Sequence, residues 1–218
     1  MTTKGLLWSA AFLIAMLRAS AYGWTALPDG TDFPVQWNIN GDANRYASKV
    51  QTLIFLPALT AVLALLFAIT PKIFPRRENL EKSRAFYMVG WLGGLGIIAI
   101  VHIGIIYTAI TGKPPLIQLT LIANGLFLVL LGNYMTKSRS NWVVGIRNPW
   151  TLSSEHSWIA TNRFAGQGFV IIGMATIISA LVLTPSITLK LVLAGLAATV
   201  FVSFGISYVA WRRDPERK

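Results

Sequence analysis

Five long windows without a single charged side chain constrain this 218-residue chain more than any other feature. They cover residues 50–71, 85–112, 114–136, 164–189 and 191–211. Each window is long enough for the roughly 20 apolar residues that a transmembrane helix needs. Charged residues make up 12% of the chain, about half the 25% of an ordinary soluble domain. The sequence therefore predicts an integral membrane protein.

A sixth apolar stretch, residues 5–27, is interrupted by Arg18. It matches the basic start and small-residue cleavage pattern of a signal peptide poorly, so we interpret it as a helix. The sequence thus predicts an all-α membrane protein with six transmembrane helices. Their expected positions are residues 6–24, 52–70, 88–110, 116–132, 167–184 and 190–210.

The Lys and Arg residues are distributed unequally between the two sides of these spans. Fourteen of the 19 lie at the amino terminus, after the second span, after the fourth span and in the tail. Four lie on the other side, and Arg18 lies within a span. Because basic loops stay in the cytoplasm, both termini are predicted there. The same basic residues give the chain its net charge of +11. Because such residues beside a membrane can contact anionic lipid head groups, the charge does not require nucleic acid as a direct partner.

The first long loop, residues 25–51, is expected outside the cell. Apolar Val35 and Trp37 alternate with polar side chains in the pattern of a strand. Asn40-Gly41 favours a tight hairpin turn. The loop is either a short cap over the helix ends or a recognition surface. The residues of that surface would be Pro34, Gln36, Trp37, Asn38 and Gly41.

The second long loop, residues 133–166, is expected in the cytoplasm. Pro149 should hold Asn148 extended, and Thr151 or Ser153 could cap a helix running to Phe164. Such a helix would lie amphipathically at the membrane surface before the fifth span. The tryptophans of this loop could be simple interfacial anchors. Its polar residues instead suggest a cluster satisfied by protein partners: Asn141, Arg147, Asn148, Glu155 and Arg163.

Three polar residues within the predicted spans are candidates for specific roles. Arg18 could extend its side chain outward toward Asp29 or Asp32, or it could line a cavity. His102 and Asn124 lie near the middle of their spans and are candidates for hydrogen bonds between helices.

Motifs for enzymatic chemistry are missing from the sequence. It has no cysteine, no phosphate-binding loop, no zinc-protease motif and no serine-hydrolase motif. The two histidines are far apart, so no metal site and no cofactor are predicted. An enzyme using His156 with Glu155 is disfavoured, because adjacent residues of a helix point about 100° apart.

The two long loops contain sequence motifs that resemble those of known bacterial protein families. In the second loop, the motifs Asn141-x-x-x-Gly145-Ile146-Arg147-x-Pro149-Trp150-Thr151-Leu152 and Glu155-x-x-Trp158-x-x-Thr161-x-Arg163-x-x-Gly166 resemble the signature of the SdpI family, bacterial membrane proteins named for immunity against a secreted sporulation-delaying toxin. The first loop resembles a small amino-terminal domain of unknown function that often precedes that signature, with Gln36 where His is common. The signature positions carried over are Asn133, Asn141, Gly145, Arg147, Pro149, Trp150, Thr151, Glu155, Trp158 and Arg163.

The resemblance implies a division into a two-helix unit, residues 1–70, and a four-helix unit, residues 71–218. It implies a non-enzymatic protein of the bacterial inner membrane that protects its cell from a peptide toxin. It also implies capture of a cytoplasmic ArsR-type repressor. The alternative from the residues is a transporter or a protein binding lipids or small molecules, in which Arg18, Arg147 and Arg163 hold an anionic group. The sequence predicts no particular oligomeric state.

Overall fold

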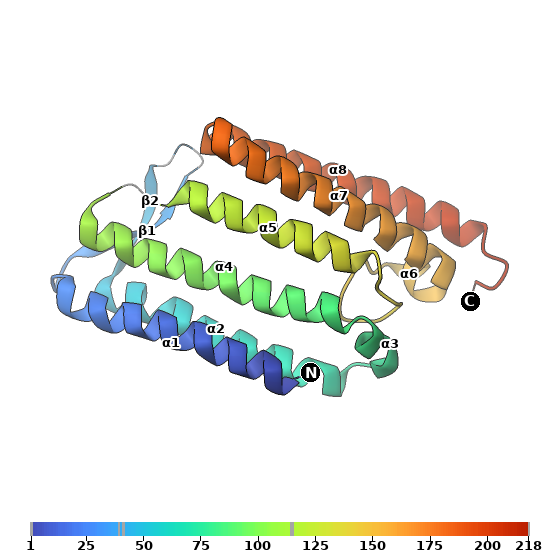
Figure 1. Cartoon of the computed structure of the whole chain (residues 1–218), viewed down its shortest axis with the longest axis horizontal. Coiled ribbons are helices and arrows are strands. Elements are labelled where there is room, and N and C mark those ends of the chain that lie inside the picture. Colours follow the sequence, from blue (N-terminus) through green and yellow to red (C-terminus); the bar gives the residue numbers. More distant parts are fainter. Residues whose placement is uncertain (1, 39, 41, 114–115, 218) are drawn as a thin grey trace.

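Six long helices lie side by side in a computed structural model that describes residues 2–38, 40, 42–113 and 116–217 (Figure 1). Both chain ends lie at one end of the bundle, which we call the terminal end. A small two-stranded hairpin lies at the opposite end, which we call the hairpin end. The even number of long helices brings the chain back to the end where it started.

All six predicted spans are confirmed as helices long and apolar enough to cross a membrane. The fifth begins at Glu155, well before the predicted residue 167. The six helices are α1 (Thr2–Ala26), α2 (Lys49–Ile73), α4 (Arg84–Thr111), α5 (Ile117–Met135), α7 (Glu155–Val182) and α8 (Pro185–Arg212).

The early start of α7 changes the predicted geometry of the second loop. Asn148 is extended before Pro149, as predicted, but its side chain caps the short helix α6 (Pro149–Ser153). Thr151 completes that capping box, so Ser154 becomes the cap of α7 instead. The residues expected in a separate surface helix are thus the first turns of a continuous membrane-spanning helix. A second short helix, α3 (Arg77–Lys82), follows α2.

The first loop forms the hairpin. Strands β1 (Asp32–Trp37) and β2 (Ala43–Ser48) pair antiparallel, which confirms the predicted strand. Phe33 is buried against Leu27, Leu53 and Ile106, so the hairpin is anchored on the ends of three helices. Such support is needed, because an isolated two-stranded hairpin is marginal in water. Gly41 of the predicted turn lies outside the described residues.

The helices α1, α2 and α4 share a core near the terminal end. Trp91 and Tyr87 are fully buried there, and Phe67 stacks on the ring of Trp91. The indole nitrogen of Trp91 donates to the hydroxyl of Ser9 on α1, at 3.0 Å. This bond satisfies the one polar atom of a large buried side chain.

Helices α5 and α7 approach each other through two pairs of glycines. A Cβ added to Gly166 would lie 2.6 Å from the carbonyl oxygen of Gly132. A Cβ added to Gly173 would lie 2.5 Å from the carbonyl oxygen of Gly125. Small residues allow helix backbones to approach closely within a membrane. The two pairs therefore set the distance between α5 and α7.

Candidate functional site

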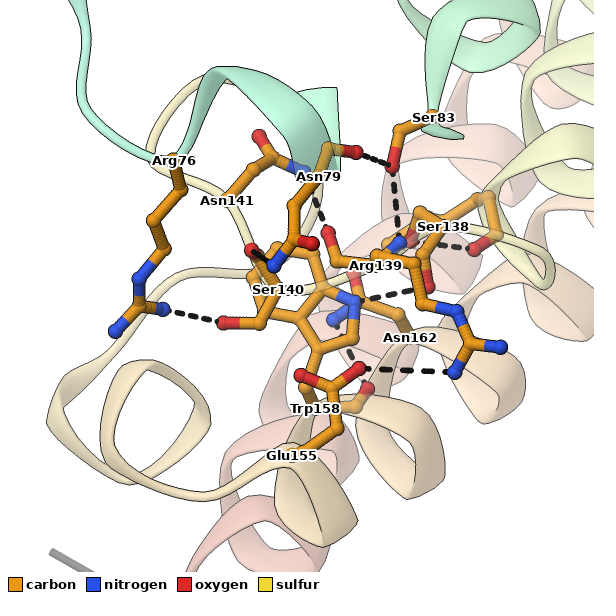
Figure 2. Close-up of polar contacts among 11 residues, drawn as sticks. Arg76, Asn79, Ser83, Ser138, Arg139, Ser140, Asn141, Glu155, Trp158 and Asn162 are labelled. Carbon is orange, nitrogen blue, oxygen red and sulfur yellow. Dashed lines mark hydrogen bonds and ion pairs between the residues drawn. The ribbon is translucent and has the colours of Figure 1, made fainter. Parts of the chain in front are cut away.

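Polar side chains, most of them buried, gather at the terminal end, where the loop between α5 and α6 folds against α3 and α7. Figure 2 shows these contacts. We call the group the loop network. It consists of Arg76, Asn79, Ser83, Ser138, Arg139, Ser140, Asn141, Gly145, Trp158 and Asn162.

Asn141 holds the loop from inside. Its side-chain oxygen accepts hydrogen bonds from the backbone amides of Val143 and Val144, both at 2.8 Å. Its side-chain nitrogen donates to the carbonyl of Arg139 at 2.7 Å. Asn141 is fully buried, so it replaces water for three backbone groups of an irregular segment.

Trp158 and Asn162, one turn apart on α7, bind the two halves of the same loop. The indole nitrogen of Trp158 donates to the carbonyl of Ser138 at 3.1 Å. The side-chain oxygen of Asn162 accepts from the amide of Ile146 at 2.8 Å. Gly145 has φ +104° and leaves no room for a Cβ, which would lie 2.6 Å from that same oxygen. A glycine is therefore required here on both conformational and steric grounds.

Residues of α3 and of the turn before it bind the loop from the opposite side. Arg76 donates to the hydroxyl of Ser140 at 2.6 Å and to the carbonyl of Leu152 at 3.0 Å. Asn79 donates to the carbonyl of Ser140 at 2.8 Å. Arg76 adopts a left-handed conformation, φ 59°, which costs free energy for a residue other than glycine. Its two contacts link the connection after α2 to the signature loop.

A second set of polar contacts ties α6 and α7 to α8. Asn148 donates from its side chain to the hydroxyl of Ser207 on α8, at 2.8 Å. Ser157 donates to the carbonyl of Ser207, also at 2.8 Å. Just beyond α8, the carboxylate of Asp214 accepts from the hydroxyl of Ser154 at 2.5 Å. The same serine hydroxyl caps α7.

The Asp214 contact predicts a dependence on pH. The hydrogen bond from Ser154, supported by the amide of Glu216 and the charges of His156 and Arg217, holds the pKa of Asp214 below its ordinary value of 3.8. A carboxyl group with a lowered pKa in the folded state stabilises that state above its unfolded pKa. The contribution should be lost as the pH falls from 3.8 through the lower folded-state value.

Hydrogen exchange of the peptide covering residues 212–217 would measure this loss. We expect faster exchange below pH 4 in the intact chain, relative to Asp214→Asn, whose side chain does not titrate. Identical pH profiles for the two chains would contradict the assignment.

The predicted signature residues divide into a buried and an exposed group. Asn141, Thr151 and Trp158 are buried, and Gly145 lies inside the network. Arg147 and Glu155 lie exposed at its rim, where Arg147 donates to the carbonyl of Trp142 and Glu155 lies 3.8 Å from Arg139. Pro149 and Trp150 start α6, and the ring of Trp150 packs edge-on against Tyr208. Asn133 and Arg163 are exposed.

Several residues of these contacts were not among the signature positions, including Arg76, Asn79, Ser83 and Asn162, and Asn148 was predicted only as a member of the polar cluster. Only Asn148 carries a signal in the sequence, since an asparagine directly before a proline is a common helix start. The others lie far from the loop in sequence or on a span, so no local pattern connects them to it.

The side chains of the loop network hold the loop in place. The amides of Asn141 and Asn162 bind backbone partners, and the hydroxyl of Ser140 accepts from Arg76. His156 and Glu155 are both exposed on the first turn of α7. Within the described residues, no three of His, Asp or Glu lie close enough to hold a metal ion.

The three polar residues predicted within the spans lie in the half of the bundle nearer the hairpin end. His102 is fully buried and forms the predicted bond between helices, with its Nε2 2.9 Å from the hydroxyl of Ser20 on α1. Asn124 does not: its side chain donates to the carbonyl of Thr120, one turn earlier on the same helix, at 2.9 Å. Arg18 is exposed on α1, and Asp29 pairs with Lys49 at 2.8 Å instead.

Asn124 also lines a cavity of about 290 Å³ beneath the hairpin. We call it the hairpin-end cavity. Trp37 and Asn38 lie at its hairpin side, and its walls come from α4, α5 and Leu189 of α8. Two predicted recognition residues and one predicted intramembrane polar residue therefore meet in one place. Pro34 and Gln36 lie on β1 but do not line this cavity.

Comparisons with known proteins match both regions. Residues 137–209 match the model of the SdpI/YfhL protein family. Residues 11–61 match a domain of unknown function, DUF1648. The chain combines an SdpI-family region with a DUF1648 region. The SdpI-family region contains most of the loop network, and the DUF1648 region contains the whole hairpin.

A curated relative supports this assignment. The Immunity protein SdpI of Bacillus subtilis (strain 168) is 25% identical over 142 residues, which is 65% of this chain and 66% of that protein. The aligned part is thus just under two thirds of the relative's length. No solved structure matches the chain.

Proposed function

We propose that this chain is a non-enzymatic immunity protein that protects a bacterial cell from a secreted peptide toxin. The observation that carries the proposal is the similarity to the Immunity protein SdpI. The combination of an SdpI-family region with a DUF1648 region supports it. A loop network whose amides bind backbone groups suits a binding and signalling role better than catalysis.

The proposal includes an orientation in the bacterial inner membrane. The terminal end would face the cytoplasm, because most of the Lys and Arg residues lie there. The hairpin end would then face outward, where a secreted toxin arrives. Membrane lipids are the surrounding partner of the six spans.

The hairpin-end cavity is the proposed point of contact with the toxin. Its walls are largely apolar, and Trp37 offers a large aromatic surface at the rim. Asn124 adds a side-chain carbonyl oxygen that its bond to Thr120 leaves available, since the amide nitrogen makes that bond. An apolar side chain of a peptide would fill the cavity, while its backbone amide would donate to Asn124.

The loop network would transmit the effect of toxin binding to the cytoplasmic side of the membrane. It connects the ends of α2, α4, α5 and α7, so a shift of these helices would change the loop surface. The exposed rim carries Arg147 and Arg139, which would suit an acidic surface on a partner. A cytoplasmic repressor of the ArsR type is the proposed partner at this rim.

The experiment that tests the function is survival of toxin-sensitive bacteria expressing the full chain. Cells with the chain and cells with an empty vector would be challenged with a panel of bacteria that secrete peptide toxins. We expect protection against at least one toxin. Unchanged sensitivity across the panel, with the chain present in the membrane, would contradict the proposal.

The alternative of an anionic ligand held by three arginines has less support. Arg18 belongs to the hairpin half of α1, whereas Arg147 lies in the loop at the terminal end. Arg163 is exposed on α7, and among the described residues no contact connects it to either arginine. A single site formed by all three would require a different packing of the helices.

A further inference from the structure

A long groove follows the outer side of α7 and α8 from the terminal end into the membrane span. Its volume is about 670 Å³, and its walls are apolar, with Ala160 on α7 and Phe201, Gly205 and Val209 on α8. Phe201 is 81% exposed. A Cβ placed on Gly205 would meet nothing within 4 Å. The groove is thus open to its surroundings, with unfilled space beside Gly205.

The polar side chains of the groove lie only at its terminal end. They are His156 in the first turn of α7 and Arg213 directly after α8. Both residues lie at the limit of a membrane-spanning helix, which is the level of lipid head groups. The groove therefore combines an apolar slot within the membrane with hydrogen-bond donors at its surface.

The donors of this groove are available for an anion. Among the described residues, neither the ring of His156 nor the guanidinium of Arg213 has a hydrogen bond or ion pair within the chain. The carboxylate of Asp214 beside them accepts from Ser154 and from the amide of Glu216. Glu155 lies 3.8 Å from Arg139. The start of α7 adds the partial positive charge of a helix amino terminus.

We propose that this groove binds one anionic phospholipid. An acyl chain lies along Ala160, Gly205 and Val209, and the phosphate is held by Arg213 and His156. A guanidinium group is well suited to bind phosphate oxygens in a bidentate manner. This inference is independent of immunity, because it rests on different residues and a different face of the bundle.

The test is native mass spectrometry of the full chain in detergent. Phosphatidylglycerol and phosphatidylcholine with identical acyl chains would be added in turn. We expect the chain to retain the anionic lipid on the order of tenfold better. The double variant Arg213→Gln with His156→Gln should lose this preference.

Two further variants make the outcome decisive. Arg217→Gln removes a cation that lies over the ring of Trp211 and does not line the groove, so the preference should remain. Gly205→Leu fills the groove and keeps both donors, so it should weaken retention of both lipids. Equal retention of phosphatidylglycerol by the intact chain and the double variant would overturn the proposal. So would a dimer of the intact chain that Gly205→Leu disrupts, since the face would then be an interface between copies.

Discussion

Gly166→Val is expected to force α5 and α7 apart and to destabilise the folded chain. The new side chain would begin 2.6 Å from the carbonyl oxygen of Gly132. Because the obstacle is backbone, no change of rotamer can relieve the clash, and the helices must separate. Overpacking of a core costs about 1–3 kcal/mol, and a clash with backbone should fall at or above the upper end of that range.

The free energy of unfolding in detergent micelles would measure this effect, with Gly94→Ala as the matched control. Gly94 is also a glycine within a membrane-spanning helix, but a Cβ there meets nothing within 4 Å. The control should be neutral or slightly stabilising, since alanine is the better helix former. Equal stability of Gly166→Val and the intact chain would show that α5 and α7 do not pack through these glycines.

Trp158→Ala is the second substitution with a large expected effect. Trp158 is fully buried between α7 and the loop and donates to the carbonyl of Ser138. Truncation of a buried tryptophan costs about 3–5 kcal/mol. Trp158→Phe retains most of the packing but leaves the carbonyl of Ser138 without its donor, so it should cost about 1–3 kcal/mol.

Unfolding curves together with near-ultraviolet circular dichroism would separate the two variants. The alanine variant should lose loop structure, which limited proteolysis between residues 136 and 148 would report. If Trp158→Ala left both stability and loop protection unchanged, Trp158 would be a membrane anchor and not part of a loop network.

The six spans could be predicted because a membrane demands long runs of apolar residues, and the gaps between charges display those runs directly. The start of α7 could not be found in this way. Its first turns carry polar Ser157, Thr161 and Asn162, which are buried by the loop and by α8. Their burial comes from tertiary contacts, and local hydropathy does not report such contacts.

The loop network was only partly predictable for a related reason. Asn141 was predicted from the polar composition of the loop and from the resemblance to a family, and Trp158 as a site residue from the resemblance alone. Arg76 and Asn79, which bind Ser140, lie more than sixty residues before it in the chain. Only the packing of α3 against the loop brings these residues together. The rim position of Arg147 likewise follows from the fold of the loop.

Trp37 and Asn124 were each predicted to matter for a different reason. The structure brings them to the same cavity, which is the proposed point of contact with the toxin. Substitutions there should change protection without changing the fold. Trp37→Ala removes an aromatic wall, and Asn124→Leu removes the available carbonyl oxygen.

The most direct measurement is survival of toxin-challenged cells that carry the intact chain, Trp37→Ala or Asn124→Leu at equal membrane levels. The matched controls are Tyr46→Ala, an exposed aromatic residue of β2, and Gln118→Leu, an exposed amide of α5. Neither control residue lines the cavity. We expect protection to be lost in the two cavity variants and kept in the two controls. Equal protection by all five chains would contradict this expectation.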